Sequence, residues 1–276
     1  MEHRALFSQR RFPLTAAMRI SNLGGALTML VIIWAVGVSV LEPPRYILPS
    51  PFAVVLAFVR QPAFLVQQSL VTVIEIMAGL AAGSTLGAAT AFAITAFPRV
   101  GRFAWPLVVV LQSFPVFVLA PILVVWLGFG LASKVAMTTL IIFFPVASAF
   151  ADGLRRTDRD IIDAVSLDGA DHWQTLTQVR APLAIPSLVS GLRVAAPLAP
   201  LGAVVGEWVG ASGGLGFVMV QANARMQTDT VFAAMVILAL LTVFLRFMVD
   251  LLTAGLTPWA TEDDLSPSFP PRSSNS

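Results

Sequence analysis

Charged side chains are rare inside the long apolar segments of this sequence. Glu75, Arg193, Arg246 and Asp250 all lie in such segments. An ionisable group there is costly unless it pairs or lines a water-filled path, so each is a functional candidate. Arg246 and Asp250 stand one helical turn apart, which favours a structural ion pair. We expect Glu75 to hold a contact between helices, and Arg193 to face either an interior path or a partner acid.

A second group of candidates interrupts an apolar segment at Gln112-Ser113-Phe114-Pro115. Proline removes a backbone hydrogen bond, which lipid tolerates only where protein or a water-filled cavity satisfies the freed carbonyl. Broken helices often line transport paths. Gln112, Ser113 and Pro115 are therefore candidates for a pathway, and a packing kink without substrate contact is the alternative.

Catalytic and metal chemistry find little support. The chain has no cysteine and two histidines, His3 and His172, so it offers neither a thiolate nor a cluster of metal ligands. Glycines surround Glu207, but no predicted strand precedes them and no phosphate-binding lysine motif occurs. The sequence predicts no cofactor, no nucleotide site and no enzymatic activity.

The elements that carry these residues are membrane helices. Hydrophobic residues make up 57% of the chain and charged residues 12%, where soluble domains carry about 25% charged residues. A membrane helix needs about 20 apolar residues. We therefore predict an all-α membrane protein with about six spans, which cover residues 23–41, 69–97, 104–127, 133–151, 183–206 and 231–256.

The first span could be mistaken for a cleaved signal, because Arg10-Arg11 precedes it. Its apolar run is longer than the 7 to 15 residues or so of a signal sequence, and Glu42-Pro43-Pro44 offers no small-residue cleavage site. With both termini cytoplasmic, the inner segments hold eleven basic residues and the outer segments four, among them Lys134. This distribution obeys the positive-inside rule and places residues 157–182 in the cytoplasm.

Residues 157–182 form the polar part of the sequence. Thr157 and Asp160 resemble a capping box that would start a helix near Asp158, and Gly169 is expected to end it in the left-handed conformation. Asp171 and Gln174 repeat the capping pattern. Pro182 is expected to stop the second helix. A DNA-binding helix-turn-helix is disfavoured, because acids outnumber arginines from residue 152 to residue 180.

Asp163-Ala164-Val165, then Gly169, then Val179-Arg180-Ala181-Pro182 resembles the EAA loop of bacterial ABC-importer permeases. The spacing matches, while Asp163, Val165 and Ala181 depart from the usual Glu, Ala and Leu. The resemblance covers residues 47–259. It implies a coupling loop that docks on a separate ATPase subunit. The residues implied are Asp163, Ala164, Gly169, Ala170, Trp173 and Pro182.

Further motifs resemble one branch of these permeases, which imports sulfonates, taurine, nitrate or hydroxymethylpyrimidine. Leu48-Pro49-Ser50-Pro51, with a surface helix expected from Phe52, resembles the branch as a whole, and Glu207 with residues 213–216 resembles its outer gate. Residues 221–227 are most similar to the hydroxymethylpyrimidine permeases, so that thiamine precursor is the expected substrate, with sulfonate, taurine or nitrate as the alternative.

The resemblance also implies partners and a domain plan. It implies two permease copies, two ATP-binding subunits and a periplasmic or lipid-anchored binding protein in the bacterial inner membrane. Residues 1–21 would be a cytoplasmic segment, 22–259 the permease domain and 260–276 a disordered cytoplasmic tail. A secondary transporter is the rival class, and it should show repeated halves, of which the sequence gives no convincing sign.

Overall fold

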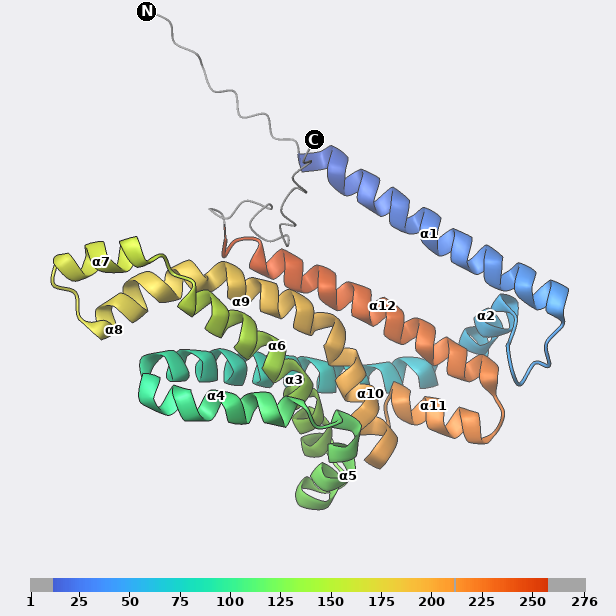
Figure 1. The fold of residues 1–276 in the computed structure, drawn as a ribbon. Helices are drawn as coiled ribbons and strands as arrows, with labels where there is room; N and C mark the ends of the chain where they lie inside the picture. Colours follow the sequence, from blue (N-terminus) through green and yellow to red (C-terminus); the bar gives the residue numbers. More distant parts are fainter. Residues whose placement is uncertain (1–11, 211, 258–276) are drawn as a thin grey trace, which may run out of the picture.

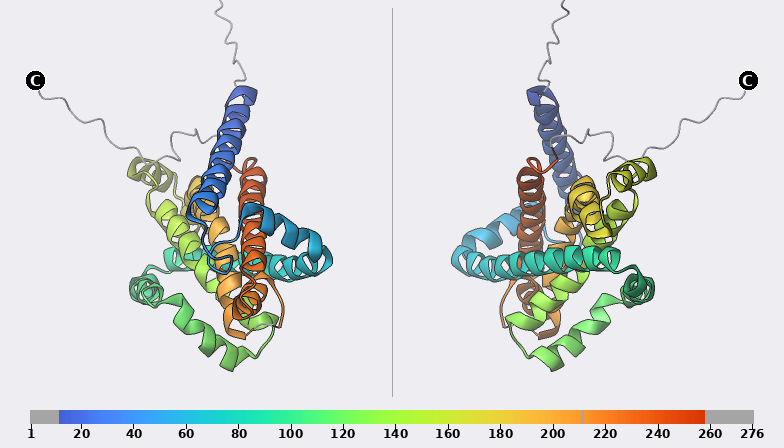
Figure 2. Two further views of the ribbon diagram at one scale, coloured as in Figure 1. Left: turned by 90° about the vertical axis from the view of Figure 1, so that its right-hand side faces the viewer. Right: turned by 90° about the vertical axis from the view of Figure 1, so that its left-hand side faces the viewer.

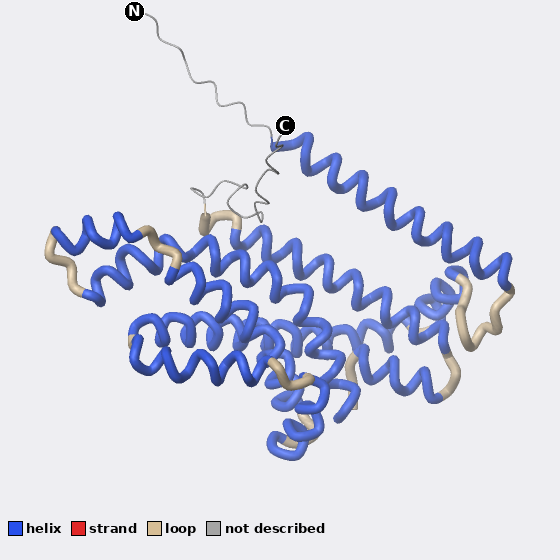
Figure 3. Tube along the Cα trace, viewed as in Figure 1, coloured by secondary structure: helices blue, strands red, loops and turns tan. Residues whose placement is uncertain are grey.

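A computed structural model describes residues 12–210 and 212–257, which form helices joined by short loops (Figure 3). No strand occurs in these two ranges, so the predicted all-α class is confirmed. Four helices there are long and apolar enough to cross a membrane. These are α3 (Pro62–Ala96), α6 (Leu131–Arg155), the continuous helix His172–Gly210 and α12 (Thr228–Thr253).

The first helix, α1 (Phe12–Leu41), contains the first predicted span and begins before it. It stands apart from the other helices along most of its length (Figures 1 and 2). Near its end, the Trp34 ring lies 5.5 Å from the Phe232 ring of α12, and Trp34 Nε1 donates to the Pro49 carbonyl at 3.1 Å. Apolar side chains such as Leu30 and Val40 are exposed on α1, as expected for a helix that faces lipid.

The third predicted span is wrong as a single helix. The chain instead forms α4 (Pro98–Gln112) and α5 (Val116–Leu127), each shorter than a bilayer requires. The interruption falls at the predicted polar break, where Pro115 is the N-cap residue of α5. Because proline has no N–H to donate, it is well tolerated at the start of a helix, where that N–H would have no partner within the helix.

The surface helix expected from Phe52 is confirmed as α2 (Pro51–Arg60). The Ser50 side chain caps it by accepting from Ala53 N at 3.2 Å, and Pro51 occupies the first turn, where its missing N–H does no harm. Val54 and Ala57 are its buried side.

Pro182 does not end its helix, contrary to expectation. α8 (His172–Gln174) continues through a π-helical turn (Thr175–Arg180) into α9 (Ala181–Ala195). In that turn Ala181 N donates to Leu176 O, five residues back. Proline in a regular α-helix clashes with the carbonyl four residues back, and the wider turn relieves this crowding. A 3₁₀ turn (Ala196–Leu198) then leads into α10 (Ala199–Gly210).

Glycines allow α3 and α6 to pack closely. A Cβ at Gly83 would lie 2.8 Å from Ile142 Cβ, and a Cβ at Gly87 would lie 2.8 Å from the Phe143 carbonyl oxygen. Small residues of this kind let membrane helices approach through their backbones. The central apolar core adds residues from α9, α10 and α12 to this helix pair.

The bundle has two distinct ends (Figure 1). α7 (Arg159–Leu167) and α8 form one, here called the α7 end. α2 and α11 (Leu215–Ala224) form the opposite one, here called the α11 end. The continuous helix His172–Gly210 begins at the α7 end and runs toward the α11 end.

Candidate coupling segment and buried carboxylate cluster

α7 is an amphipathic helix that contacts little else. It begins next to Asp158, as predicted, although Asp158 itself is the N-cap and accepts from Asp160 N at 3.0 Å in place of Thr157. None of its residues is buried, and Leu167 is 88% exposed. Asp163 and Ala164 are exposed too. An apolar side chain so open on a short charged helix suits contact with another molecule.

The bend after α7 has the predicted geometry. Gly169 has φ +83°, the left-handed conformation that glycine adopts without strain. Gly169 N donates to Ser166 O and Ala170 N donates to Val165 O, which closes the helix end. The capping box predicted for α8 is confirmed, with Gln174 N donating to Asp171 Oδ1 at 2.7 Å and Asp171 N to Gln174 Oε1 at 2.9 Å.

α8, unlike α7, is tied to the bundle. The Trp173 ring meets Phe92 of α3 edge to face at 5.9 Å, and His172 Nε2 lies 3.2 Å from the Ala96 carbonyl oxygen. Leu176 is fully buried in the core cluster at this end of the bundle. Pro182 is exposed. The segment therefore has one free helix and one anchored helix, with the Gly169 bend between them.

The three pathway candidates stay near one another at the α4–α5 break. Gln112 and Ser113 are exposed, and Ser113 Oγ donates back to Val109 O at 3.3 Å. Within the described ranges, no hydrogen bond or ion pair joins them to Arg193 or Glu207. They mark an open bend between two short helices.

Arg193 faces a partner acid, one of the two outcomes expected for it. Arg193 Nε lies 2.9 Å from Asp250 Oδ1, and Arg246 Nε lies 2.9 Å from Asp250 Oδ2. Arg246 also donates to the Arg193 carbonyl oxygen at 2.6 Å. The predicted pairing of Arg246 with Asp250 is confirmed, and this network joins α9 to α12.

Glu207 is buried within a network of polar groups. Its Oε1 accepts from Thr72 Oγ1 at 2.7 Å, and its Oε2 accepts from Gly216 N. Thr72 Oγ1 in turn accepts from Leu215 N at 2.8 Å. A Cβ at Gly214 would collide with the Glu207 carboxylate. The glycines after Glu207 thus leave room for its carboxylate and give it a backbone donor.

Glu75 lies beside this network and pairs with a lysine. Glu75 Oε1 is 3.6 Å from Lys134 Nζ, and both side chains are at least 94% buried. Glu75 and Lys134 both interact electrostatically with Glu207. We call Thr72, Glu75, Lys134 and Glu207 the carboxylate cluster. It joins α3, α6 and α10.

Sequence reasoning found the two acids of the cluster but missed their partners. Lys134 had been counted with the outer segments, whereas it lies in the first turn of α6 and is 5% exposed. Thr72 stands one turn before Glu75 on α3, and that helical spacing was the available signal. No group of three or more metal-ligating side chains occurs in the described part of the chain.

Comparison with known proteins identifies the family. The model of the binding-protein-dependent transport system inner membrane component matches residues 79–260. The chain belongs to this family. A probable ABC transporter permease protein of Haemophilus influenzae is 42% identical over 222 residues, which is 80% of this chain and 91% of that protein.

Other relatives carry more specific names. The formylaminopyrimidine transport permease protein ThiX of Halalkalibacterium halodurans is 36% identical over 232 residues, covering 84% of this chain and 92% of ThiX. The taurine transport permease TauC of Escherichia coli is 29% identical over 259 residues, 91% of this chain and 94% of TauC. An inward-facing MetNI methionine ABC transporter chain has the same fold, with a TM-score of 0.62, 21% identity, and coverage of 71% of this chain and 99% of that one.

The chain is therefore the membrane component of an ABC importer of the inner membrane. Its family and fold indicate a transport component and not a catalytic enzyme. A permease of this class works with a separate ATPase and a substrate-binding protein.

Proposed function

We propose that this permease forms the membrane pathway for the thiamine precursor hydroxymethylpyrimidine, with ATP hydrolysed by a subunit that docks on α7. The observation that carries the coupling role is the free helix α7 beside the anchored helix α8. An ATPase subunit that docks on α7 would contact Asp163, Ala164 and Leu167, which are exposed. A displacement of α7 by this subunit is then transmitted through the Gly169 bend to α8.

The helix that begins with α8 supplies the connection to the opposite end of the bundle. At about 1.5 Å per residue, the 39 residues of His172–Gly210 span roughly 58 Å. Glu207 lies near the far end of this helix, in the carboxylate cluster. Because the helix is not interrupted at Pro182, movement at the α7 end can be transmitted to Glu207, the proposed outer gate.

A neutral substrate is favoured because three cations within the long membrane helices are paired with acids. Lys134, Arg193 and Arg246 each face a carboxylate, so none of these three offers a free positive charge to a sulfonate or nitrate. A neutral aromatic ring needs hydrogen bonds and an apolar wall. Gln112 and Ser113 at the α4–α5 break are the proposed polar contacts. ThiX, whose name includes a pyrimidine, is the more similar of the two relatives named for a substrate above.

The pathway is proposed to form between two copies of the chain, with two ATPase subunits at the α7 ends and a binding protein at the α11 ends. This arrangement requires the α7 end to be cytoplasmic. The chain has no cysteine, so single cysteines report on topology directly. In intact cells, cysteine at exposed Gln221 should react with an impermeant reagent, and cysteine at exposed Ala164 should react only after the inner face is opened. The reverse labelling pattern would contradict coupling through α7.

Growth tests the substrate. A strain that cannot make the pyrimidine half of thiamine should need this gene to grow on external hydroxymethylpyrimidine. The alternative follows from the relative named for taurine. If deletion leaves pyrimidine rescue intact but abolishes the use of taurine or another sulfonate, the alternative substrate class is correct.

A further inference from the structure

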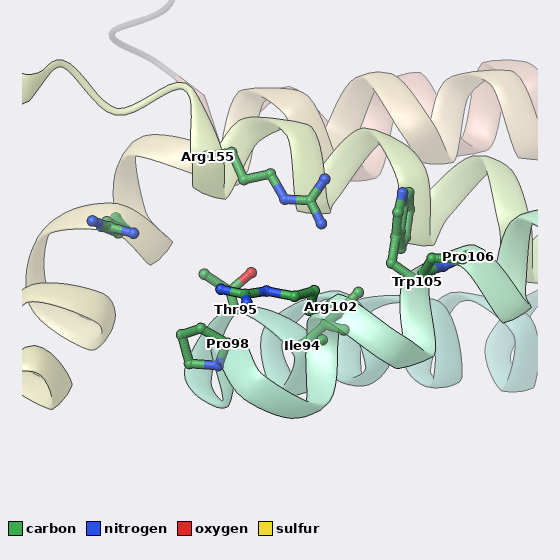
Figure 4. A pocket seen from close by; sticks show the side chains of 9 residues that line it. Ile94, Thr95, Pro98, Arg102, Trp105, Pro106 and Arg155 are labelled. Carbon is green, nitrogen blue, oxygen red and sulfur yellow. The ribbon is translucent and has the colours of Figure 1, made fainter.

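A pocket of 380 Å³ lies at the α7 end of the bundle, between the α3–α4 hairpin and the ends of α6 and the π-helical turn (Figure 4). Three arginines contribute to its wall from three different elements. They are Arg102 of α4, Arg155 of α6 and Arg180 of the π-helical turn. None of the nine lining residues is acidic.

These arginines have no acidic partner among the described residues. Among the described residues, the side chains of Arg102, Arg155 and Arg180 take part in no ion pair. Arg180 Nε is buried and has no hydrogen-bond acceptor within the same ranges. The Arg155 guanidinium lies 5.0 Å from the centre of the Trp105 ring, which holds it over the pocket. A buried guanidinium N–H is costly without an acceptor, so Arg180 Nε is suited to an anionic group that enters the pocket.

The rest of the pocket is apolar. Ile94, Pro98, Trp105 and Pro106 line it beside the arginines. On the adjoining face of α4, Phe103 is 82% exposed and Leu107 is 63% exposed. A ligand that suits this lining combines an anionic group with an apolar body.

The ends of two predicted membrane helices place the pocket at the expected depth of the lipid headgroups. It opens where α3 ends at Ala96 and α6 ends at Arg155, and both helices are long enough to cross the membrane. Tryptophan is enriched at this depth, and basic pockets between membrane helices bind anionic lipid headgroups. Guanidinium groups bind phosphate through paired N–H donors.

We propose that this pocket binds one anionic phospholipid. Arg102, Arg155 and Arg180 receive its phosphate, and its acyl chains lie along Phe103 and Leu107 of α4. The bound lipid would join α4 to the π-helical turn, next to the coupling segment. The proposal needs only that the chain spans a membrane, so it holds whichever substrate is imported.

The test is a titration of the full chain, delipidated in the complex that it forms with its ATPase, followed by native mass spectrometry. The probes are phosphatidylglycerol, phosphatidylcholine and inorganic phosphate. The variant Arg155→Gln/Arg180→Gln removes two of the three charges. The control Arg99→Gln/Arg156→Gln makes the same charge change at exposed residues of the same end that do not line the pocket.

The wild type and the control should bind phosphatidylglycerol alike, and the pocket variant should bind it about 25-fold more weakly, roughly fivefold per arginine. Phosphatidylcholine should not compete, and excess inorganic phosphate should not displace the lipid. Equal lipid binding by all three proteins would overturn the proposal, and displacement by phosphate would reassign the site to a small anion. If the pocket variant loses the ATPase subunit but binds lipid as the wild type does, the proposal is overturned and the arginines belong to the interface with the ATPase.

Discussion

The carboxylate cluster and the α7 end both contain charged side chains, but these are paired within the chain in the cluster and form no ion pair among the described residues of the α7 end. In the cluster, the side chains of Glu75, Glu207 and Lys134 are buried; Glu75 pairs with Lys134, and Glu207 accepts from Thr72 Oγ1 and Gly216 N, while Glu75 Oε2 has no hydrogen-bond partner within the described residues. At the α7 end, α7 buries none of its residues, and the three pocket arginines form no ion pair within the described chain. A buried charge destabilises a protein unless it is paired, whereas an exposed one costs little. The charges of the cluster thus meet their partners within the chain, whereas the α7 end presents groups that another molecule can contact.

The largest loss of stability is expected when the cluster loses its only base. Lys134→Met leaves Glu75 and Glu207 buried without their cation, which should cost about 3–5 kcal/mol. Lys134→Met/Glu75→Leu removes the ion pair together and should recover most of that loss, because Glu207 keeps its donors Thr72 Oγ1 and Gly216 N. The melting temperatures of both variants in detergent, compared with that of the wild type, measure these changes in stability. If Lys134→Met is as stable as the wild type, the ion pair contributes nothing to stability.

A smaller loss of stability is expected from Gly214→Ala. Comparison with a control variant separates the effect of backbone strain from that of steric crowding. Gly214 has φ +107°, and its new Cβ would displace the Glu207 carboxylate. Gly128→Ala is the matched control, because Gly128 has φ +82° with no atom within 4 Å of the added Cβ. The control should lose about 1–2 kcal/mol from the backbone alone, and Gly214→Ala should lose more. Equal melting temperatures would mean that the cluster adapts freely.

At the α7 end, Gly169→Val should cost about 1–2 kcal/mol locally, because valine is strained at φ +83° although no atom lies within 4 Å of the added Cβ. Membrane insertion should be normal, while ATPase capture or transport should fall. Gly169→Asn is the matched control, since asparagine tolerates the left-handed conformation. It should retain most of the activity. Equal loss in both variants would point to something other than the bend.

The smallest change in stability is expected from Asp163→Ala, within about 0.5 kcal/mol, because the side chain is exposed. Pull-down of the ATPase should nevertheless weaken. Asp152→Ala removes an exposed acid from the neighbouring end of α6 and should leave capture unchanged. If Asp163→Ala and Gly169→Val both capture the ATPase and transport at wild-type rates, α7 is only a linker.

Local sequence signals determined much of this protein. Apolar runs predicted the four long membrane helices, although not the division of the third predicted span into α4 and α5. The types of Asp171, Gln174 and Gly169 predicted a cap and a bend that the structure contains. The cap and the bend depend on residues a few positions apart, so a short stretch of sequence is enough to predict them. The family resemblance of residues 163–182 rests on the same kind of short pattern.

Tertiary structure decided which distant groups meet. Glu75, Lys134 and Glu207 come from three helices, and no spacing along the chain shows that they share one buried site. The same holds for Arg193 with Asp250, and for the arginines of the pocket. Pro182 read alone predicts a helix end, whereas in the structure the helix passes it after a π-helical turn. Sequence fixes local backbone preference, while the partner of a buried charge depends on how the helices pack against one another.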